Sequence, residues 1–289
     1  MTKEIAKSIK ARLLNIAQKE NLNNQQLTVR YLFERVLYRL SVSKFKDRFC
    51  LKGGTLLYAL AKDMPRPTLD IDFLGINLSN EIVFIKKAFT EILSIKCNED
   101  GIVFEIASIE AKELTGNKLY AGIRVSFVAL LDTFKQAMQI DIGFGDVITP
   151  APQNLRYPVF FDELPTPEIL VYSLETIVAE KFHAMIERSD TNSRYKDFYD
   201  VYKIFTTQKI DDNVLGAAIR ATFQNRKTGY QNNHPLFTDE FSTEKNRTTQ
   251  WRNFLRKIKQ DDDLSFETVM TVISKKLQPI FETLKQLKT

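Results

Sequence analysis

The sequence predicts an α+β protein, with a mixed sheet and flanking helices in the first half and a mainly helical second half. Segments rich in β-branched and aromatic residues recur up to Ile142, whereas apolar residues at helical spacing dominate from Ser173 onward. Five prolines from Pro150 to Pro167 separate the two patterns and predict an irregular crossover. We therefore expect one α+β domain over residues 1–150 and a mainly helical C-terminal domain over residues 151–289.

The elements of the first half follow from local patterns. Apolar residues recur every three to four positions from Ile5 to Leu40, which predicts two helices within Thr2–Arg48, broken at the polar segment Asn23–Gln26. Alternating or β-branched segments predict strands. The expected strands are Arg48–Lys52, Leu69–Leu74, Ile102–Ile109, Ala121–Leu130 and Ala137–Ile142, with helices over Thr55–Ala61 and Ile82–Leu93.

The second half predicts a run of helices, because apolar residues line one face at helical spacing and charged residues fill the other. The expected helices are Ser173–Arg188, Lys196–Phe205, Asp212–Gln224, Glu244–Ile258 and Phe266–Leu287. The polar segment Thr228–Asp239 interrupts them.

Composition limits the chemistry that this chain can use. Two cysteines, Cys50 and Cys97, and two histidines, His183 and His234, exclude a disulfide framework and a zinc site built from these residue types. The net charge of +5 is compatible with a polyanionic substrate without requiring one. The first residues lack the apolar core of a secretory signal, and no segment approaches the roughly 18 apolar residues of a membrane span. We therefore expect a cytoplasmic protein.

Asp70 and Asp72 are two residues apart on the expected strand Leu69–Leu74, so both carboxylates should point to one face of the sheet. Two like charges repel each other unless a cation lies between them, and Mg²⁺ prefers such oxygen ligands. Asp141, on the expected strand Ala137–Ile142, would add a third carboxylate if the two strands are neighbours. Three carboxylates suffice for two metal ions, Mg²⁺ or alternatively Mn²⁺, that bridge a nucleoside triphosphate and an attacking hydroxyl.

Gly53, Gly54 and Thr55 lie where the first expected strand ends and a helix begins. Glycines let backbone N–H groups approach a phosphate closely, and the helix N-terminus and the Thr55 hydroxyl add to this. Arg66 and Thr68 precede the acidic strand and are further candidate nucleotide contacts. Taken singly, each motif has a structural alternative: a turn without a ligand, or the solvent-exposed face of an edge strand.

Together, the glycine turn, the Asp-x-Asp strand and the later acidic strand resemble the DNA polymerase β-type nucleotidyltransferase superfamily. Within it, the sequence is similar to the AbiEii/AbiGii toxin family, whose relatives include the MenT toxins. The matching stretches are LKGGTLLYAL, RPTLDIDFLG, IDIGFGDVITP, ETIVAEKFHAMIER and RYKDFYDVYKIF. Two features depart from the superfamily pattern: the gap between Gly54 and Asp70 is longer, and Thr55 replaces a serine.

This resemblance implies a nucleotidyltransferase fold and Mg²⁺-dependent transfer of a nucleotide from an NTP to an RNA acceptor, most simply a tRNA. It also implies the role of a toxin in a toxin–antitoxin or abortive-infection system. The expected partners are the NTP, the RNA and a cognate antitoxin that need not bind the toxin directly.

The resemblance further implies that Lys181 binds nucleotide and that Asp197 acts as a catalytic residue or supports Lys181. From the residues alone, Lys181 can equally extend to solvent beside an apolar helix face, and Asp197 can simply favour a helix N-terminus. Arg194 can hold phosphate or pair with Asp197. Asp200 shares a helix face with Asp197 and is expected to support the site or to pack.

Two other classes of protein fit part of this pattern. A metal-dependent nuclease would use the acidic residues and the lysine but has no use for the glycine turn. A non-catalytic nucleotide-binding module would use the acidic residues to hold a structural metal ion.

Overall fold

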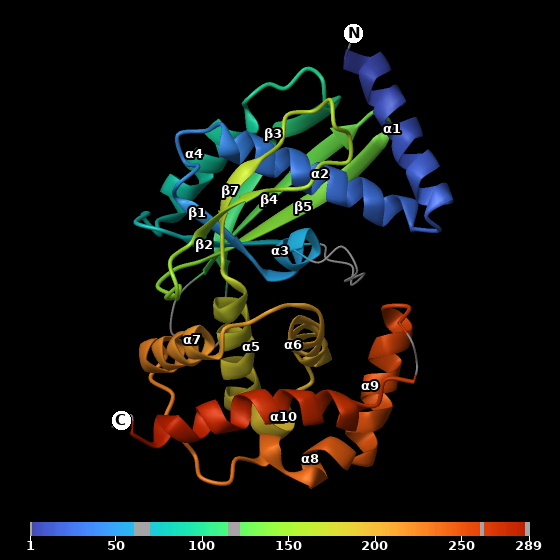
Figure 1. Ribbon diagram of the computed structural model, residues 1–289. Helices are drawn as coiled ribbons and strands as arrows, with labels where there is room; N and C mark the ends of the chain where they lie inside the picture. Colours follow the sequence, from blue (N-terminus) through green and yellow to red (C-terminus); the bar gives the residue numbers. More distant parts are fainter. Residues whose placement is uncertain (1, 61–69, 115–121, 261–262, 287–289) are drawn as a thin grey trace. The chain divides into compact units, whose positions relative to one another are not determined.

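The computed structural model describes residues 2–60, 70–114, 122–260 and 263–286 (Figure 1). Contacts divide the chain into two compact units. Unit 1 comprises Met1–Gly145 and Gln153–Val171, and unit 2 comprises Asp146–Pro152 and Tyr172–Thr289. The predicted fold class is confirmed, because unit 1 is built on a mixed sheet with flanking helices and unit 2 is mainly helical.

The described residues of unit 1 form a seven-stranded sheet in the order β3-β4-β5-β2-β1-β7-β6. The pairs β2–β5 and β1–β7 are parallel, and the other neighbours are antiparallel. The elements of this unit are α1 (Thr2–Lys19), α2 (Asn24–Ser41), β1 (Phe49–Lys52), α3 (Gly53–Leu60), β2 (Ile71–Gly75), α4 (Ile82–Leu93), β3 (Ile102–Leu114), β4 (Gly122–Leu131), β5 (Phe134–Gly143), β6 (Gln153–Arg156) and β7 (Glu168–Val171).

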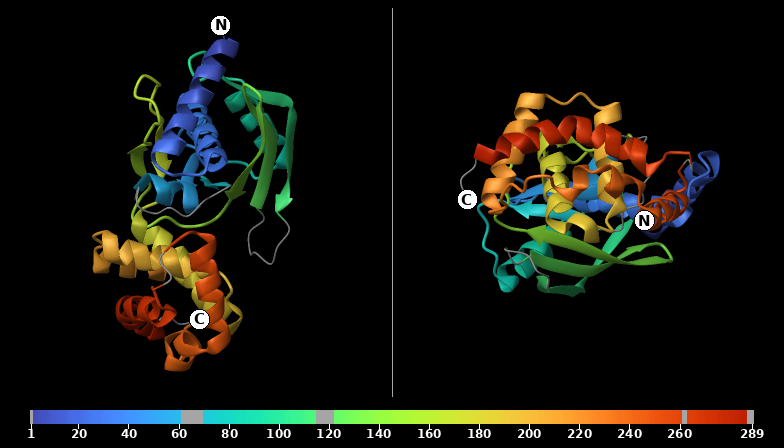
Figure 2. Two further views of the ribbon diagram at one scale, coloured as in Figure 1. Left: turned by 90° about the vertical axis from the view of Figure 1, so that its right-hand side faces the viewer. Right: turned by 90° about the horizontal axis from the view of Figure 1, so that it is seen from below.

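The central strands are apolar on the face that packs against helices. Phe49, Phe73 and Ile140 are fully buried, and α2 runs along the sheet, where it contacts α1, α4 and β7 (Figures 1 and 2). Asn23 caps α2 by accepting a hydrogen bond from the backbone N–H of Gln26. This capping places the start of α2 at the polar break that the sequence predicts.

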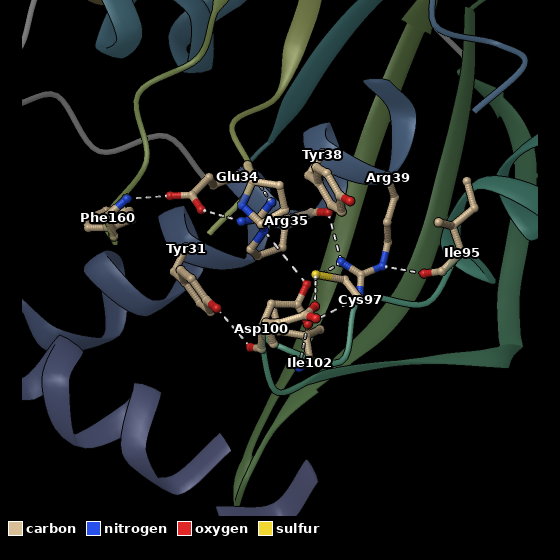
Figure 3. Close-up of polar contacts among 12 residues, drawn as sticks. Tyr31, Glu34, Arg35, Tyr38, Arg39, Ile95, Cys97, Asp100, Ile102 and Phe160 are labelled. Atoms are coloured by element: carbon tan, nitrogen blue, oxygen red, sulfur yellow. Dashed lines mark hydrogen bonds and ion pairs between the residues drawn. The ribbon is translucent and has the colours of Figure 1, made fainter. Parts of the chain in front are cut away.

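A buried network of charged side chains ties α2 to two distant loops (Figure 3). Arg39 donates to the Asp100 carboxylate at 2.6 Å, and Arg35 lies 3.8 Å from the same group and 3.2 Å from Glu34. Glu34 accepts a hydrogen bond from the backbone N–H of Phe160 at 2.8 Å. Burial raises the pKa of Glu34 to about 7, although Arg35 and the Phe160 N–H act in the opposite direction.

The structure differs from the sequence-based expectation in the proline-rich segment. This segment contributes β6 and β7, and β7 pairs in parallel with β1. Contacts therefore group Gln153–Val171 with unit 1, whereas the sequence placed a single boundary at residue 150. Strands of four residues between prolines give too short a pattern to be distinguished from a loop. The pairing of β7 with β1, and of β6 with β7, decides their conformation.

Unit 2 contains the expected helices and one short addition, α8. Its helices are α5 (Leu174–Arg188), α6 (Tyr195–Thr207), α7 (Asp212–Asn225), α8 (Asp239–Thr243), α9 (Lys245–Lys257) and α10 (Phe266–Thr283), with 3₁₀ turns η1 (Ser189–Thr191), η2 (Pro235–Phe237) and η3 (Leu284–Gln286). Phe182, Phe223 and Phe281 pack against one another in its core. Each helix in the described ranges is too short or too polar to cross a membrane.

Candidate active site

The glycine turn and the acidic strand lie against each other in unit 1. β1 pairs with β2 so that Lys52 is opposite Asp72, and α3 begins at Gly53, the next residue. Gly53 has a φ of 72°, and a Cβ atom added there would lie 2.0 Å from Oδ2 of Asp72. A side chain at this position would displace the carboxylate, so glycine is required both for the backbone conformation and for the space that Asp72 occupies.

Thr55 fixes the start of the acidic strand. Its hydroxyl donates a hydrogen bond to the backbone carbonyl of Asp70 at 2.9 Å, and the residue is 1% exposed. This contact holds Asp70 next to the first turn of α3. The expected contact between Thr55 and a phosphate stays a prediction.

Asp72 and Asp141 are register partners on the parallel strands β2 and β5. The predicted third carboxylate therefore lies on the strand next to the first two. Register partners point to the same face of a sheet, and both side chains are partly exposed on that face. Asp70, the residue before β2, is also partly exposed.

Two cations that sequence reasoning missed flank this pair of acids. Arg124 of β4 is the register partner of Asp141 and donates to both of its carboxylate oxygens at 2.7 Å. Lys52 of β1 is the register partner of Asp72. Four neighbouring strands thus carry a row of charges in the order Lys52, Asp72, Asp141, Arg124. One signal for Arg124 is present in the sequence, because it is the only charged residue within β4.

All three candidate carboxylates affect the pKa of Arg124. Its hydrogen bonds to Asp141 raise the pKa of the guanidinium, and the charges of Asp141, Asp70 and Asp72 raise it further, against the effect of partial burial. The negative charges of three acids therefore stabilise one guanidinium, and the same negative charges would attract a metal cation.

Carboxylate oxygens such as those of Asp70, Asp72 and Asp141 are the ligands that Mg²⁺ prefers. The positive charge beside Asp141 in this structure is the guanidinium of Arg124. Within the described ranges, no three histidine, cysteine or acidic side chains are gathered closely enough to hold a metal ion. Both oxygens of Asp141 accept a hydrogen bond from Arg124. Coordination by all three acids stays a prediction.

A second polar cluster lies in unit 2, where α5 and α6 contact each other. The Lys181 ammonium donates to Asp197 and to Asp200, each at 2.8 Å, and its side chain is 13% exposed. Arg194 donates to the other oxygen of Asp197 at 2.6 Å. Asp197 and Asp200 are one turn apart on α6, so both face Lys181.

The two acids keep Lys181 charged. Burial acts against the ammonium, yet Asp197 and Asp200 hold the pKa of Lys181 above its usual value. Burial also opposes ionisation of Asp197, but Lys181 and Arg194 hold the pKa of that carboxyl below its usual range. The structure shows Arg194 paired with Asp197, which is one of the two alternatives for this arginine, and Lys181 held by two acids. Nucleotide binding by Lys181 stays a prediction.

The predicted site residues thus fall into two groups. Gly53, Gly54, Thr55, Asp70, Asp72 and Asp141 belong to unit 1, and Lys181, Arg194 and Asp197 belong to unit 2. Arg66 and Thr68 lie outside the described residues.

Comparison with protein families identifies this arrangement. The family model "Nucleotidyl transferase AbiEii toxin, Type IV TA system" matches residues 35–272, which include both groups. This chain belongs to the AbiEii family. The resemblance seen in the sequence is confirmed, and the protein is an enzyme, a nucleotidyltransferase of a toxin family. Membership implies a nucleotide substrate and an antitoxin partner, and nucleotidyltransferases of this kind generally use a divalent metal ion.

Two crystal structures from Helicobacter pylori share the fold of this AbiEii chain. One, of a candidate nucleotidyltransferase, has a TM-score of 0.50 and 16% identity over 93% of this chain and 100% of that chain. The other, of JHP933, has a TM-score of 0.50 and 15% identity over 92% of this chain and 96% of that chain. No curated protein matches the chain.

Proposed function

We propose that this AbiEii enzyme transfers a nucleotide from an NTP to a hydroxyl of an RNA acceptor, in particular a tRNA, and acts in the cytoplasm as a toxin. The observation that carries this proposal is the register of Asp72 with Asp141 beside the glycine turn. The acceptor oxygen forms a bond to the α-phosphorus, and the bond from that phosphorus to the β-phosphate oxygen breaks. Pyrophosphate leaves, and the proton of the hydroxyl passes to a carboxylate of the site.

The residues of unit 1 supply the charge and the donors that this reaction needs. Asp70, Asp72 and Asp141 would hold the divalent ions, Mg²⁺ in this proposal. When bound, such ions lower the pKa of the acceptor hydroxyl and neutralise charge on the leaving pyrophosphate. The backbone N–H groups of the Gly53–Thr55 turn, at the N-terminus of α3, would orient phosphate oxygens. Asp141 is the proposed proton acceptor.

Arg124 positions Asp141 in this proposal. Its two hydrogen bonds orient the carboxylate, and its charge reduces the repulsion among the three acids before a cation is bound. Lys181 is proposed to bind the phosphates as a point charge, oriented by Asp197 and Asp200. Arg194 holds Asp197 in place and thereby supports Lys181.

One experiment separates this function from the two alternatives. Each α-labelled NTP is incubated with the protein, Mg²⁺ and total RNA. Label that moves onto full-length RNA supports nucleotidyl transfer. Shortening of RNA without incorporation of label supports a nuclease, and neither result supports a binding module.

A further inference from the structure

A groove with a volume of 610 Å³ opens along α9, and its walls belong to unit 2. They include Asn192, Tyr195, Arg247, Gln250, Phe254 and Lys257. None of these residues belongs to the proposed transfer site. The groove nevertheless adjoins it within unit 2, because Asn192 accepts a hydrogen bond from the backbone N–H of Arg194, the arginine that pairs with Asp197.

Two buried donors of this groove lack a hydrogen-bond acceptor in the described part of the chain. Asn192 is 2% exposed, and its Oδ1 is used by Arg194, so Nδ2 is left unpaired. Reversing the amide would set two donors against each other, which fixes this orientation. Arg247 is 5% exposed and donates through Nη1 and Nη2 to the carbonyls of Asn192 and Asp190, while its Nε makes no hydrogen bond and lies 3.5 Å from the Glu244 carboxylate.

Unpaired buried donors are costly in a folded protein, and a ligand with acceptor atoms relieves that cost. The groove is lined by two carboxylates, Asp190 and Glu244, and by two cations, Arg247 and Lys257, so its shape and its donors, more than its net charge, suit a flat ligand with acceptor atoms. Tyr195 and Phe254 are half-buried and contact Trp251, with ring centroids 6.2 Å and 5.5 Å from it, so their positions are fixed by packing. The amide of Gln250 can both donate and accept hydrogen bonds.

The helix α9 is strongly basic, and two of its cations, Arg247 and Lys257, line the groove. α9 carries five cationic residues and no acidic residue: Lys245, Arg247, Arg252, Arg256 and Lys257. A cationic helix beside aromatic rings and amide groups is the combination that proteins use to bind unpaired nucleotides, because bases stack on rings and phosphates are attracted by lysine and arginine.

We propose that the α9 groove binds an unpaired nucleotide of the RNA acceptor. This inference rests on the proposed function, to which it adds the binding site and the single-stranded character of the substrate. The base lies against Tyr195 and Phe254, its acceptor atoms receive hydrogen bonds from Asn192 and Arg247, and Lys257 attracts the adjoining phosphate.

The test measures binding of a fluorescein-labelled single-stranded oligoribonucleotide to the full chain by anisotropy, at one fixed salt concentration. The variant Gln250→Ala/Lys257→Ala removes two exposed side chains of the groove. Its matched control, Thr249→Ala/Arg252→Ala, removes the same charge from exposed positions on the same helix outside the groove. We expect the groove variant to bind roughly tenfold or more weakly and the control to bind within about twofold of wild type.

Equal binding by the groove variant and wild type overturns the proposal, as does an equal loss in both variants, which would show only a general effect of charge. An unlabelled duplex that competes as well as the single strand overturns it too. Binding does not depend on transfer, so the two failures are distinguishable. If wild type labels RNA and the groove variant binds normally, the proposed function stands and the proposed role of the groove is wrong. If wild type labels no RNA but only the groove variant loses binding, the proposed transfer fails and binding of single-stranded RNA by the groove stands.

Discussion

Arg124 of β4 donates two hydrogen bonds of 2.7 Å to Asp141 of β5, the register partner of Asp72. Each oxygen of a carboxylate that is proposed to hold a metal ion therefore accepts a hydrogen bond from a guanidinium. We expect this relationship to couple the stability of the protein without Mg²⁺ to its response to Mg²⁺.

Arg124→Ala should lower the unfolding free energy without Mg²⁺ by roughly 1–3 kcal/mol, because a charged hydrogen-bonded pair is lost and three acids are left together. Mg²⁺ should then raise the Tm of this variant more than it raises the Tm of wild type. Thermal melts with and without Mg²⁺ measure both effects, and Arg124→Lys, which keeps the charge but not the two-pronged contact, should lie between the two. Equal Mg²⁺ shifts in all three proteins would contradict this coupling.

Asp72→Asn should reduce transfer at least roughly hundredfold while the fold persists, because the amide keeps the shape that packs against Gly53 but removes the charge. Removing one of several repelling acids should leave the Tm without Mg²⁺ equal to or above that of wild type. Transfer assays and melts on the same preparation check this. A strongly lowered Tm would mean that Asp72 is structural and would make the kinetic loss uninformative.

Gly53→Ala should destabilise the protein by roughly 1–3 kcal/mol and abolish transfer, because the new Cβ meets Asp72 at 2.0 Å in a left-handed backbone conformation. Gly216→Ala in α7 is the matched control, since its Cβ would meet nothing nearer than 3.7 Å. We expect that control to be neutral or slightly stabilised, with full activity. Denaturant titration and transfer assays measure both variants, and a fully active Gly53→Ala protein would contradict the close approach.

Lys181→Ala should weaken NTP binding strongly, but it should also destabilise the fold by roughly 3–5 kcal/mol, because Asp197 and Asp200 lose the cation between them. The double variant Lys181→Met/Asp200→Asn removes one charge of each sign and should recover much of the stability without recovering binding. Lys181→Arg should recover binding only in part. Titration of a fluorescent NTP against the folded variants measures this, and wild-type affinity in the double variant would show that Lys181 does not bind phosphate.

Glu34 should contribute a fall in stability as the pH rises between about 4.5 and 7, whereas His183, whose pKa burial and Arg226 lower to about 4, contributes a rise over much of the same range. Burial raises the pKa of Glu34 from 4.5 to about 7, so in this range the folded protein keeps a proton that the unfolded chain has lost. The contribution is fully present below pH 4.5, is lost above about pH 7, and amounts to at most about 3 kcal/mol. The difference between the melts of wild type and Glu34→Gln from pH 4.5 to 8 isolates it, since wild type should lose stability relative to the variant as the pH rises. Parallel profiles would mean that Glu34 stays ionised in the fold.

The parts of the fold that depend on local pattern could be predicted from the sequence. The bounds of α4 match the expected helix Ile82–Leu93, because its apolar stripe and its polar flanks are both local. The alternation around Asp72 and Asp141 likewise placed both acids on strands. Their adjacency in the sheet was only a condition of the sequence-based hypothesis, and the register of β2 with β5 fulfils that condition.

The parts that depend on long-range pairing could not be predicted. Arg124 is recognisable as a partner of Asp141 only once β4 is aligned with β5, and β7 is recognisable as a strand only once it is paired with β1 and β6. Arg35 and Arg39 look like ordinary solvent-exposed helix residues in the sequence, yet both are buried against Asp100, which lies some sixty residues further along the chain. Local periodicity carries no information about such partners.

The most direct test of this account uses one NTP labelled in parallel reactions at the α- and at the γ-phosphate, with Mg²⁺ and total RNA, for wild type and Asp141→Asn. Wild type should move the α-label onto RNA that is lengthened by the added nucleotide and should release the γ-label as pyrophosphate. Asp141→Asn should do neither while it remains folded. Transfer of the γ-label to RNA, shortened RNA without label, or full activity in Asp141→Asn would contradict this account.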